Sequence, residues 1–130
     1  MKTKNILLAT LALTGLSASC TAQKAVKTLE PQEFATAAKS DTSGIVIDVR
    51  KAEEFAEGHL AGAININWLD SNAFAKGERG LDQTRTYYIY CRSGRRSLAA
   101  AQKMQADGFR VINMNGGILH WTELGLPLEK

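Results

Sequence analysis

Runs of apolar residues recur along the chain and predict its strands. Two of them, at 45–49 and 86–90, are rich in β-branched and aromatic side chains and have almost no polar interruption. This pattern is typical of strands buried on both faces of a parallel sheet. Shorter apolar stretches at 26–29, 63–66 and 111–114 predict three more strands.

Segments with helical character separate these strands. We expect helices at 31–39, 50–55, 68–74, 97–107 and 118–124. The segment 76–85 has two glycines and five charged residues, so it is expected to be a surface loop. Strict alternation of strands and helices predicts an α/β fold with a central, mostly parallel sheet of about five strands and helices on both faces.

The first nineteen residues have the pattern of a signal peptide. Lys2 and Lys4 precede an apolar stretch at 6–16, and small residues follow at 17–19. This stretch is well short of the ~20 residues that a membrane-spanning helix needs, and a buried core helix is the alternative. We therefore expect an exported protein of the periplasm or cell envelope, with a signal peptide at 1–19, a short tether at 20–24 and one domain at 25–130.

Cys20 has two predicted fates. The segment that ends at Cys20 resembles the lipobox of bacterial lipoproteins, in which the chain is cleaved before the cysteine and a lipid is attached to it. Ser17 stands where that pattern usually has leucine, and plain cleavage after Ala22 is the alternative. We favour lipidation, which would attach the protein to a membrane. Either fate leaves Cys91 as the only free thiol.

Composition and charge bear on whether the chain binds nucleic acid. The chain has 45% hydrophobic and 22% charged residues, as an ordinary globular domain does. Its net charge of +3 includes Lys2 and Lys4, so the chain without residues 1–19 carries only +1. This balance gives no support to nucleic acid binding. We expect a monomer without a metal ion or any other cofactor.

Cys91 is the candidate nucleophile. It directly follows the predicted strand 86–90, and in open α/β sheets the site lies where the carboxyl ends of the strands meet the loops. The loop after it holds three arginines, a glycine and two serines, which are Arg92, Ser93, Gly94, Arg95, Arg96 and Ser97. Loop N–H groups and a helix N-terminus favour a thiolate or another anion. An inert buried cysteine is the alternative, but it would not need such a loop.

This loop, read from Tyr90 to Ser97, resembles the active-site loop of single-domain rhodaneses. Asp48-Val49-Arg50, Glu54-Phe55 and the segment 58–65 are similar to the N-terminal signature of that family, and 115–121 is similar to its C-terminal signature. The match spans roughly residues 26–128, nearly the whole chain after the signal peptide, and its three motifs occur in order and at the proper spacing. The chain thus resembles a secreted or periplasmic member of the rhodanese family.

The resemblance implies a sulfurtransferase with the rhodanese fold. The Cys91 thiolate would take the outer sulfur of a donor such as thiosulfate as a persulfide and pass it to cyanide or a thiol. Residues Arg92 to Ser97 would bind the anionic donor and the persulfide. Asp48, Arg50 and His59 are expected to support the loops near the site rather than to react.

Three other functions compete with this interpretation. Related phosphatases and arsenate reductases share the fold, but their loop is one residue longer, with the anion-binding arginine six positions after the cysteine. Here that position is Ser97, and Arg96 lies five positions after Cys91. A binding module without catalysis would often lack the cysteine. A persulfide carrier that delivers sulfur to an envelope protein is the third alternative.

Overall fold

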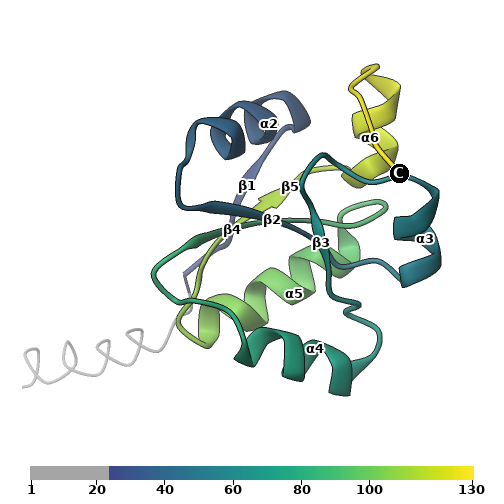
Figure 1. Cartoon of the computed structure of the whole chain (residues 1–130). Coiled ribbons are helices and arrows are strands. Elements are labelled where there is room, and N and C mark those ends of the chain that lie inside the picture. Colours follow the sequence, from purple (N-terminus) through teal and green to yellow (C-terminus); the bar gives the residue numbers. More distant parts are fainter. Residues whose placement is uncertain (1–23) are drawn as a thin grey trace, which may run out of the picture.

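Five parallel strands form the centre of the computed structural model, which describes residues 24–130 (Figure 1). They are β1 (Lys27–Leu29), β2 (Gly44–Asp48), β3 (Ile64–Asn65), β4 (Thr86–Tyr90) and β5 (Arg110–Met114). Their order in the sheet is β1-β5-β4-β2-β3, and each neighbouring pair is parallel. The predicted α/β fold with about five strands is confirmed.

Helices cover both faces of the sheet (Figure 1). They are α2 (Pro31–Ser40), α3 (Ala52–Glu57), α4 (Ser71–Arg79), α5 (Arg95–Ala106) and α6 (Gly117–Glu123). Helices α2 and α6 pack on one face, while α4 and α5 pack on the other. The short helix α3 follows β2, beside the carboxyl ends of the central strands (Figure 1).

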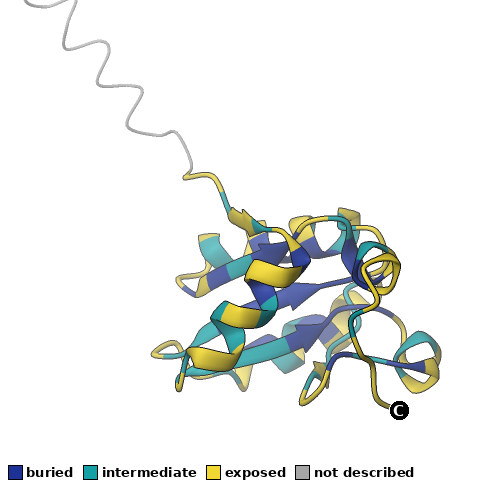
Figure 2. Cartoon of the chain, turned by 90° about the horizontal axis from the view of Figure 1, so that it is seen from above, coloured by how far each residue is buried: buried dark blue, intermediate teal, exposed yellow. Residues whose placement is uncertain are grey.

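Strands in the middle of the sheet supply large side chains to the core, and Figure 2 shows buried stretches of the sheet between exposed helix surfaces. Strand β4 is buried from Tyr87 to Tyr90, and its neighbour β2 is buried at Ile47 and Asp48. Ile47 and Ile89 face α4 and α5 and have no exposed surface. Tyr88 and Tyr90 point to the opposite face, where they meet Phe34 of α2. Burying one such large apolar side chain contributes about 1.5–3 kcal/mol. The β-branched and aromatic runs of the sequence therefore form the centre of the sheet.

Helix α4 differs from its prediction. It begins three residues later than expected and continues into the segment predicted to be a surface loop. Asp70 fixes its start, because the carboxylate of Asp70 accepts a hydrogen bond from the N–H of Ala73 at 3.1 Å. Gly77 lies inside the helix because the helix packs closely on Ile66 at this point. A Cβ at position 77 would lie only 2.8 Å from the side chain of Ile66. The charged segment also contains Glu78, which is buried against α5.

The start of the chain lies outside the described residues, and so do the predicted signal peptide at 1–19 and the predicted lipidation of Cys20. The described part begins at Lys24, whose carbonyl accepts a hydrogen bond from Gln105 of α5 at 2.8 Å. Within residues 24–130, no helix is long and apolar enough to span a membrane.

Candidate active site

Cys91 lies at the carboxyl end of β4, at the bottom of the loop that leads into α5. Its side chain is almost fully buried, with 1% of the residue exposed. The sulfur accepts hydrogen bonds from the backbone N–H groups of Gly94 at 3.1 Å and Ser97 at 3.3 Å. Because backbone donors favour a negatively charged acceptor, this geometry suits a thiolate.

The loop closes tightly around the sulfur because of Gly94. This residue precedes α5 and has φ +102°, a backbone conformation that residues other than glycine rarely adopt. Helix α5 begins at Arg95, two residues earlier than predicted. The first turn of a helix has N–H groups without helical partners, and it carries a partial positive charge. The buried Ser97 donates its hydroxyl to the Gly94 carbonyl at 3.2 Å, which holds this turn closed.

The C-terminal motif supports the loop from the side. The N–H of Ile118 donates to the Cys91 carbonyl at 2.9 Å, and the N–H of Leu119 donates to the Arg92 carbonyl at 3.1 Å. Gly117 makes this approach possible, since a Cβ at this position would lie 2.2 Å from the Arg92 carbonyl oxygen. Gly117 also has φ +63°. The first turn of α6 therefore holds the carbonyl groups of both Cys91 and Arg92 in place.

The three arginines of the loop differ in their surroundings. Arg92 and Arg95 are exposed, while Arg96 is half-buried and paired with Glu54 of α3. Two hydrogen bonds of 2.8 and 3.1 Å join the guanidinium to the carboxylate. These hydrogen bonds from Arg96 lower the pKa of Glu54 to about 2. In turn, Glu54 raises the pKa of Arg96, and the nearby Cys91 contributes to this rise. Arg96 is thus held in place, and Arg92 and Arg95 are available to an anion.

Asp48 and Arg50 form a buried ion pair beneath the loop. The Arg50 Nε and Nη2 atoms lie 3.0 and 2.8 Å from the two carboxylate oxygens of Asp48. The hydroxyl of Tyr90, the residue before Cys91, donates to Asp48 Oδ2 at 2.6 Å. Burial, and then the Asp48 charge, raise the pKa of Tyr90, so its hydroxyl stays protonated and serves as this donor. The pair therefore braces the end of β4.

The same cluster fixes the chain after α3. Arg50 Nη2 also donates to the Gly58 carbonyl at 2.7 Å, and the N–H of Leu60 donates to the Tyr90 hydroxyl at 3.1 Å. The amide of Asn65 donates to the carbonyls of both Asp48 and Arg50 at 2.9 Å. Sequence reasoning singled out neither Tyr90 nor Asn65 as a supporting residue. Their only signal was a place inside the family motifs.

Among the described residues, His59 contacts α3 and not the sulfur of Cys91. Its ring stacks on Phe55, with centroids 3.8 Å apart and planes 5° from parallel. Its Nδ1 lies 3.0 Å from the Phe55 carbonyl. The structure therefore places His59 as a support for α3.

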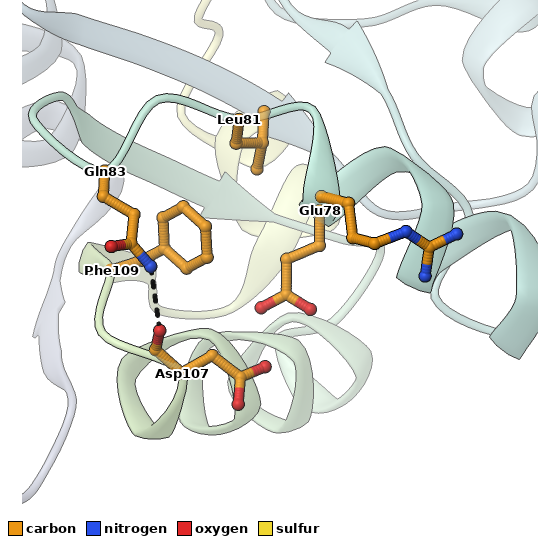
Figure 3. A pocket seen from close by; sticks show the side chains of 6 residues that line it. Glu78, Leu81, Gln83, Asp107 and Phe109 are labelled. Carbon is orange, nitrogen blue, oxygen red and sulfur yellow. Dashed lines mark hydrogen bonds between the residues drawn. The ribbon is translucent and has the colours of Figure 1, made fainter.

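Two cavities lie away from Cys91. One of about 320 Å³, shown in Figure 3, is lined by Glu78, Arg79, Leu81, Gln83, Asp107 and Phe109. These residues precede β4 and β5, so this cavity lies at the amino ends of the strands, opposite the site. A larger, mainly apolar hollow of about 650 Å³ lies over β2 between α2 and α6. Neither contains a residue of the Cys91 loop.

Comparison with known proteins identifies the family. Residues 30–124, which include the whole Cys91 loop and the motifs that hold it, match the family model of the rhodanese-like domain. The chain belongs to the rhodanese-like domain family. The resemblance that the sequence motifs indicate is confirmed at this level.

Two relatives and one solved structure match this rhodanese-like domain over most of their own length. The "Putative sulfurtransferase YtwF" of Bacillus subtilis is 34% identical over 98 residues, which cover 72% of this chain and 92% of that protein. A "Sulfurtransferase" of Allochromatium vinosum is 33% identical over 91 residues, covering 68% and 82%. The solved structure of a rhodanese-related protein from Thermoplasma volcanium superimposes with a TM-score of 0.69 at 27% identity, covering 79% of this chain and 97% of that one.

Proposed function

We propose that this rhodanese-like domain is a sulfurtransferase that carries sulfur as a persulfide on Cys91. Its donor is an anion of the thiosulfate class, and its acceptor is a thiophile such as cyanide or a thiol. The observation that supports the proposal most strongly is the position of the Cys91 sulfur, which accepts two backbone N–H groups inside a closed loop at a helix N-terminus. The sulfurtransferase names of relatives at 33–34% identity agree with it.

The reaction takes place in two steps. First, the Cys91 thiolate attacks the outer sulfur of thiosulfate, the S–S bond of the donor breaks, and sulfite leaves with its electron pair. A new S–S bond of about 2.05 Å then joins the outer sulfur to Cys91. Second, the acceptor attacks this outer sulfur, and the bond to Cys91 breaks to return the thiolate. No external oxidant or reductant enters the cycle.

The loop supplies different groups to each species. The exposed Arg92 and Arg95 attract the dianionic donor to the mouth of the site. The N–H groups of Gly94 and Ser97 hold the sulfur of Cys91. The remaining N–H groups of the first turn of α5 are then available to the charged outer sulfur of the persulfide. Arg96, held by Glu54, adds a fixed positive charge beside it.

A mass measurement tests this proposal. Thiosulfate treatment of the purified domain should add ~32 Da, one sulfur atom, to Cys91, and cyanide should remove it and form thiocyanate. Cys91→Ser should show neither change. If wild-type protein gains no mass and instead hydrolyses a phosphate ester, the proposal is wrong and the chain is a phosphatase. The buried Ser97, at the position where the related phosphatases have arginine, argues against that outcome.

A protein lacking both activities would be a binding module. A persulfide that forms with thiosulfate but passes to a protein thiol and not to cyanide would identify a persulfide carrier. The mass on Cys91 after the two treatments separates the sulfurtransferase, the persulfide carrier and the binding module, and hydrolysis of a phosphate ester separates a phosphatase from the binding module.

The location of the protein is a separate proposal, based on residues 1–24 of the sequence. We propose export to the cell envelope with a lipid on Cys20. Cells given a labelled fatty acid should then incorporate the label into this protein. A soluble, unlabelled product that begins at Gln23 would contradict lipidation while leaving export intact.

A further inference from the structure

The C-terminal tail folds back over the loop that follows α3. The backbones of His59 and Glu129 exchange two hydrogen bonds of 2.9 Å, as in an antiparallel bridge. The Glu129 carboxylate accepts a hydrogen bond from the N–H of Gly62 at 3.1 Å and lies 3.9 Å from Nε2 of His59. The tail is fixed at its start as well, because Trp121 donates its indole N–H to the Pro127 carbonyl at 3.0 Å.

This tail reaches the active site through His59. The ring of His59 stacks on Phe55 and its Nδ1 lies within hydrogen-bond distance of the Phe55 carbonyl. Phe55 follows Glu54 in α3, and Glu54 holds Arg96 beside Cys91. A continuous series of contacts therefore joins Glu129 to the Cys91 loop.

Helix α3 depends on these contacts for its position. It has only six residues, and none of them is fully buried. Isolated helices of this length are unstable in water, and α3 has no apolar face anchored in the core. Its attachments among the described residues are the chain itself, the hydrogen bond from Arg50 to Gly58 at its end, the Glu54–Arg96 pair and the contacts with His59.

We propose that Glu129 is a positioning residue and that the tail segment 127–130 is a clasp that holds α3, and with it Glu54 and Arg96, against the Cys91 loop. The catalytic consequence rests on the proposed sulfur transfer. The structural consequence, a fixed α3, does not. Loss of the clasp should slow formation of the persulfide without weakening recruitment of the donor, because Arg92 and Arg95 lie on α5 and its loop and not on α3.

Two variants of the full domain test the clasp. A chain ending at Pro127 loses both the side chain and the backbone bridge of Glu129, and kcat for sulfur transfer from thiosulfate should fall about tenfold while KM changes less than about twofold. Glu129→Ala loses only the side chain and should show a smaller fall of about threefold. Glu129→Gln keeps an acceptor for the N–H of Gly62 and should have a kcat close to that of wild type. Glu123→Ala, an exposed glutamate of α6, is the matched control and should have no effect.

A double variant separates positioning from general destabilisation. If Glu129 acts through Glu54, the effect of Glu129→Ala on kcat should disappear in a Glu54→Gln background, because contacts in one series are not additive. Full additivity of the two substitutions would contradict the proposal.

Hydrogen exchange tests the clasp without any activity. The backbone N–H groups of Phe55 and Gly58 should exchange at least about tenfold faster in the chain ending at Pro127, while those of β4 should not change. Unchanged exchange in α3 overturns the clasp even if the wild-type domain transfers sulfur. Faster exchange in α3 supports the clasp even if the wild-type domain fails to transfer sulfur.

Discussion

Glu54 and Arg96 face each other as a two-pronged pair, with the Nη1–Oε1 atoms 2.8 Å apart and the Nη2–Oε2 atoms 3.1 Å apart. The side chains are 24% and 20% exposed, so water and salt screen their attraction only in part. The pair joins α3 to the first turn of α5, whose backbone surrounds the sulfur of Cys91. The charge of Arg96 is therefore fixed in space before any donor arrives, and a preorganised charge is more effective than a mobile one.

Removing the charge of Glu54 should slow sulfur transfer more than it weakens donor binding. Glu54→Gln breaks the pair with Arg96, and we expect kcat to fall about tenfold, equivalent to ~1.4 kcal/mol of transition-state stabilisation. KM for thiosulfate should change little. Glu53→Gln is the matched control, because Glu53 precedes Glu54 in the same helix and is exposed. Equal effects of the two substitutions would show that only the charge of α3 matters, and not the pair.

The Glu54 pair also predicts how stability depends on pH. Its carboxyl has a pKa of about 2 in the folded protein, below the ordinary glutamate value of 4.5, chiefly because of the hydrogen bonds from Arg96. A depressed pKa means that the folded state binds this proton more weakly than the unfolded state does, so the stabilisation is present above pH ~4.5 and is lost as the pH falls towards 2. Denaturant unfolding of wild type and Glu54→Gln should therefore differ by a constant amount from pH 5 to 7, and the difference should shrink below about pH 4.5. A difference that stays constant down to about pH 3 would contradict the pair.

Arg92 and Arg95 should control recruitment of the donor. Both are exposed, and exposed charges attract a dianion in a manner that salt screens. The double substitution to Gln should raise KM for thiosulfate about tenfold at low ionic strength. The ratio of its KM to that of wild type should shrink in about 0.5 M salt or above. Arg79→Gln, at the amino ends of the strands in the cavity of Figure 3, is the control and should leave KM unchanged. A KM ratio independent of salt would assign the two arginines to direct short-range contacts instead.

Gly117→Ala should displace the Cys91 loop. A methyl group at this position would lie 2.2 Å from the Arg92 carbonyl oxygen, and the φ of +63° adds a conformational cost. Gly125→Ala is the matched control, because Gly125 has φ +74° but nothing within 4 Å of the added methyl. The control should lose only about 1–2 kcal/mol of stability from its backbone. Gly117→Ala should lose more, and the rate at which iodoacetamide alkylates Cys91 should change only in Gly117→Ala. Similar alkylation rates in both variants would mean that the loop does not depend on α6.

Local sequence was enough to predict the sheet and the Cys91 loop. The β-branched runs identify β2 and β4 because burial on both faces requires such residues, and the loop consists of consecutive residues whose geometry glycine and the following helix determine. Contacts between distant segments were not predictable. Glu54 and Arg96 are 42 positions apart, and the family motif that contains Glu54 does not indicate which residue it pairs with.

The segment 76–85, predicted to be a surface loop, shows the same limit. Its charges and glycines are typical of a loop, yet its first four residues continue α4 because Gly77 packs on Ile66 and Glu78 pairs with Lys103 of α5. These tertiary contacts override the local preference.

Tyr90→Phe should uncouple the buried support of the loop from its chemistry. The substitution removes one donor to Asp48, which keeps its hydrogen bonds from Arg50, and leaves the buried N–H of Leu60 without a partner, at a cost of about 1–3 kcal/mol. Tyr87→Phe is the matched control in the same strand, because the Tyr87 hydroxyl makes two comparable hydrogen bonds to the backbone of Asp82, at the far end of the sheet. Thermal unfolding should show both variants destabilised. Sulfur transfer measured well below the unfolding temperature should fall only in Tyr90→Phe, since Tyr90 adjoins Cys91. An equal loss of transfer in both variants would mean that activity follows global stability and not the Asp48 cluster.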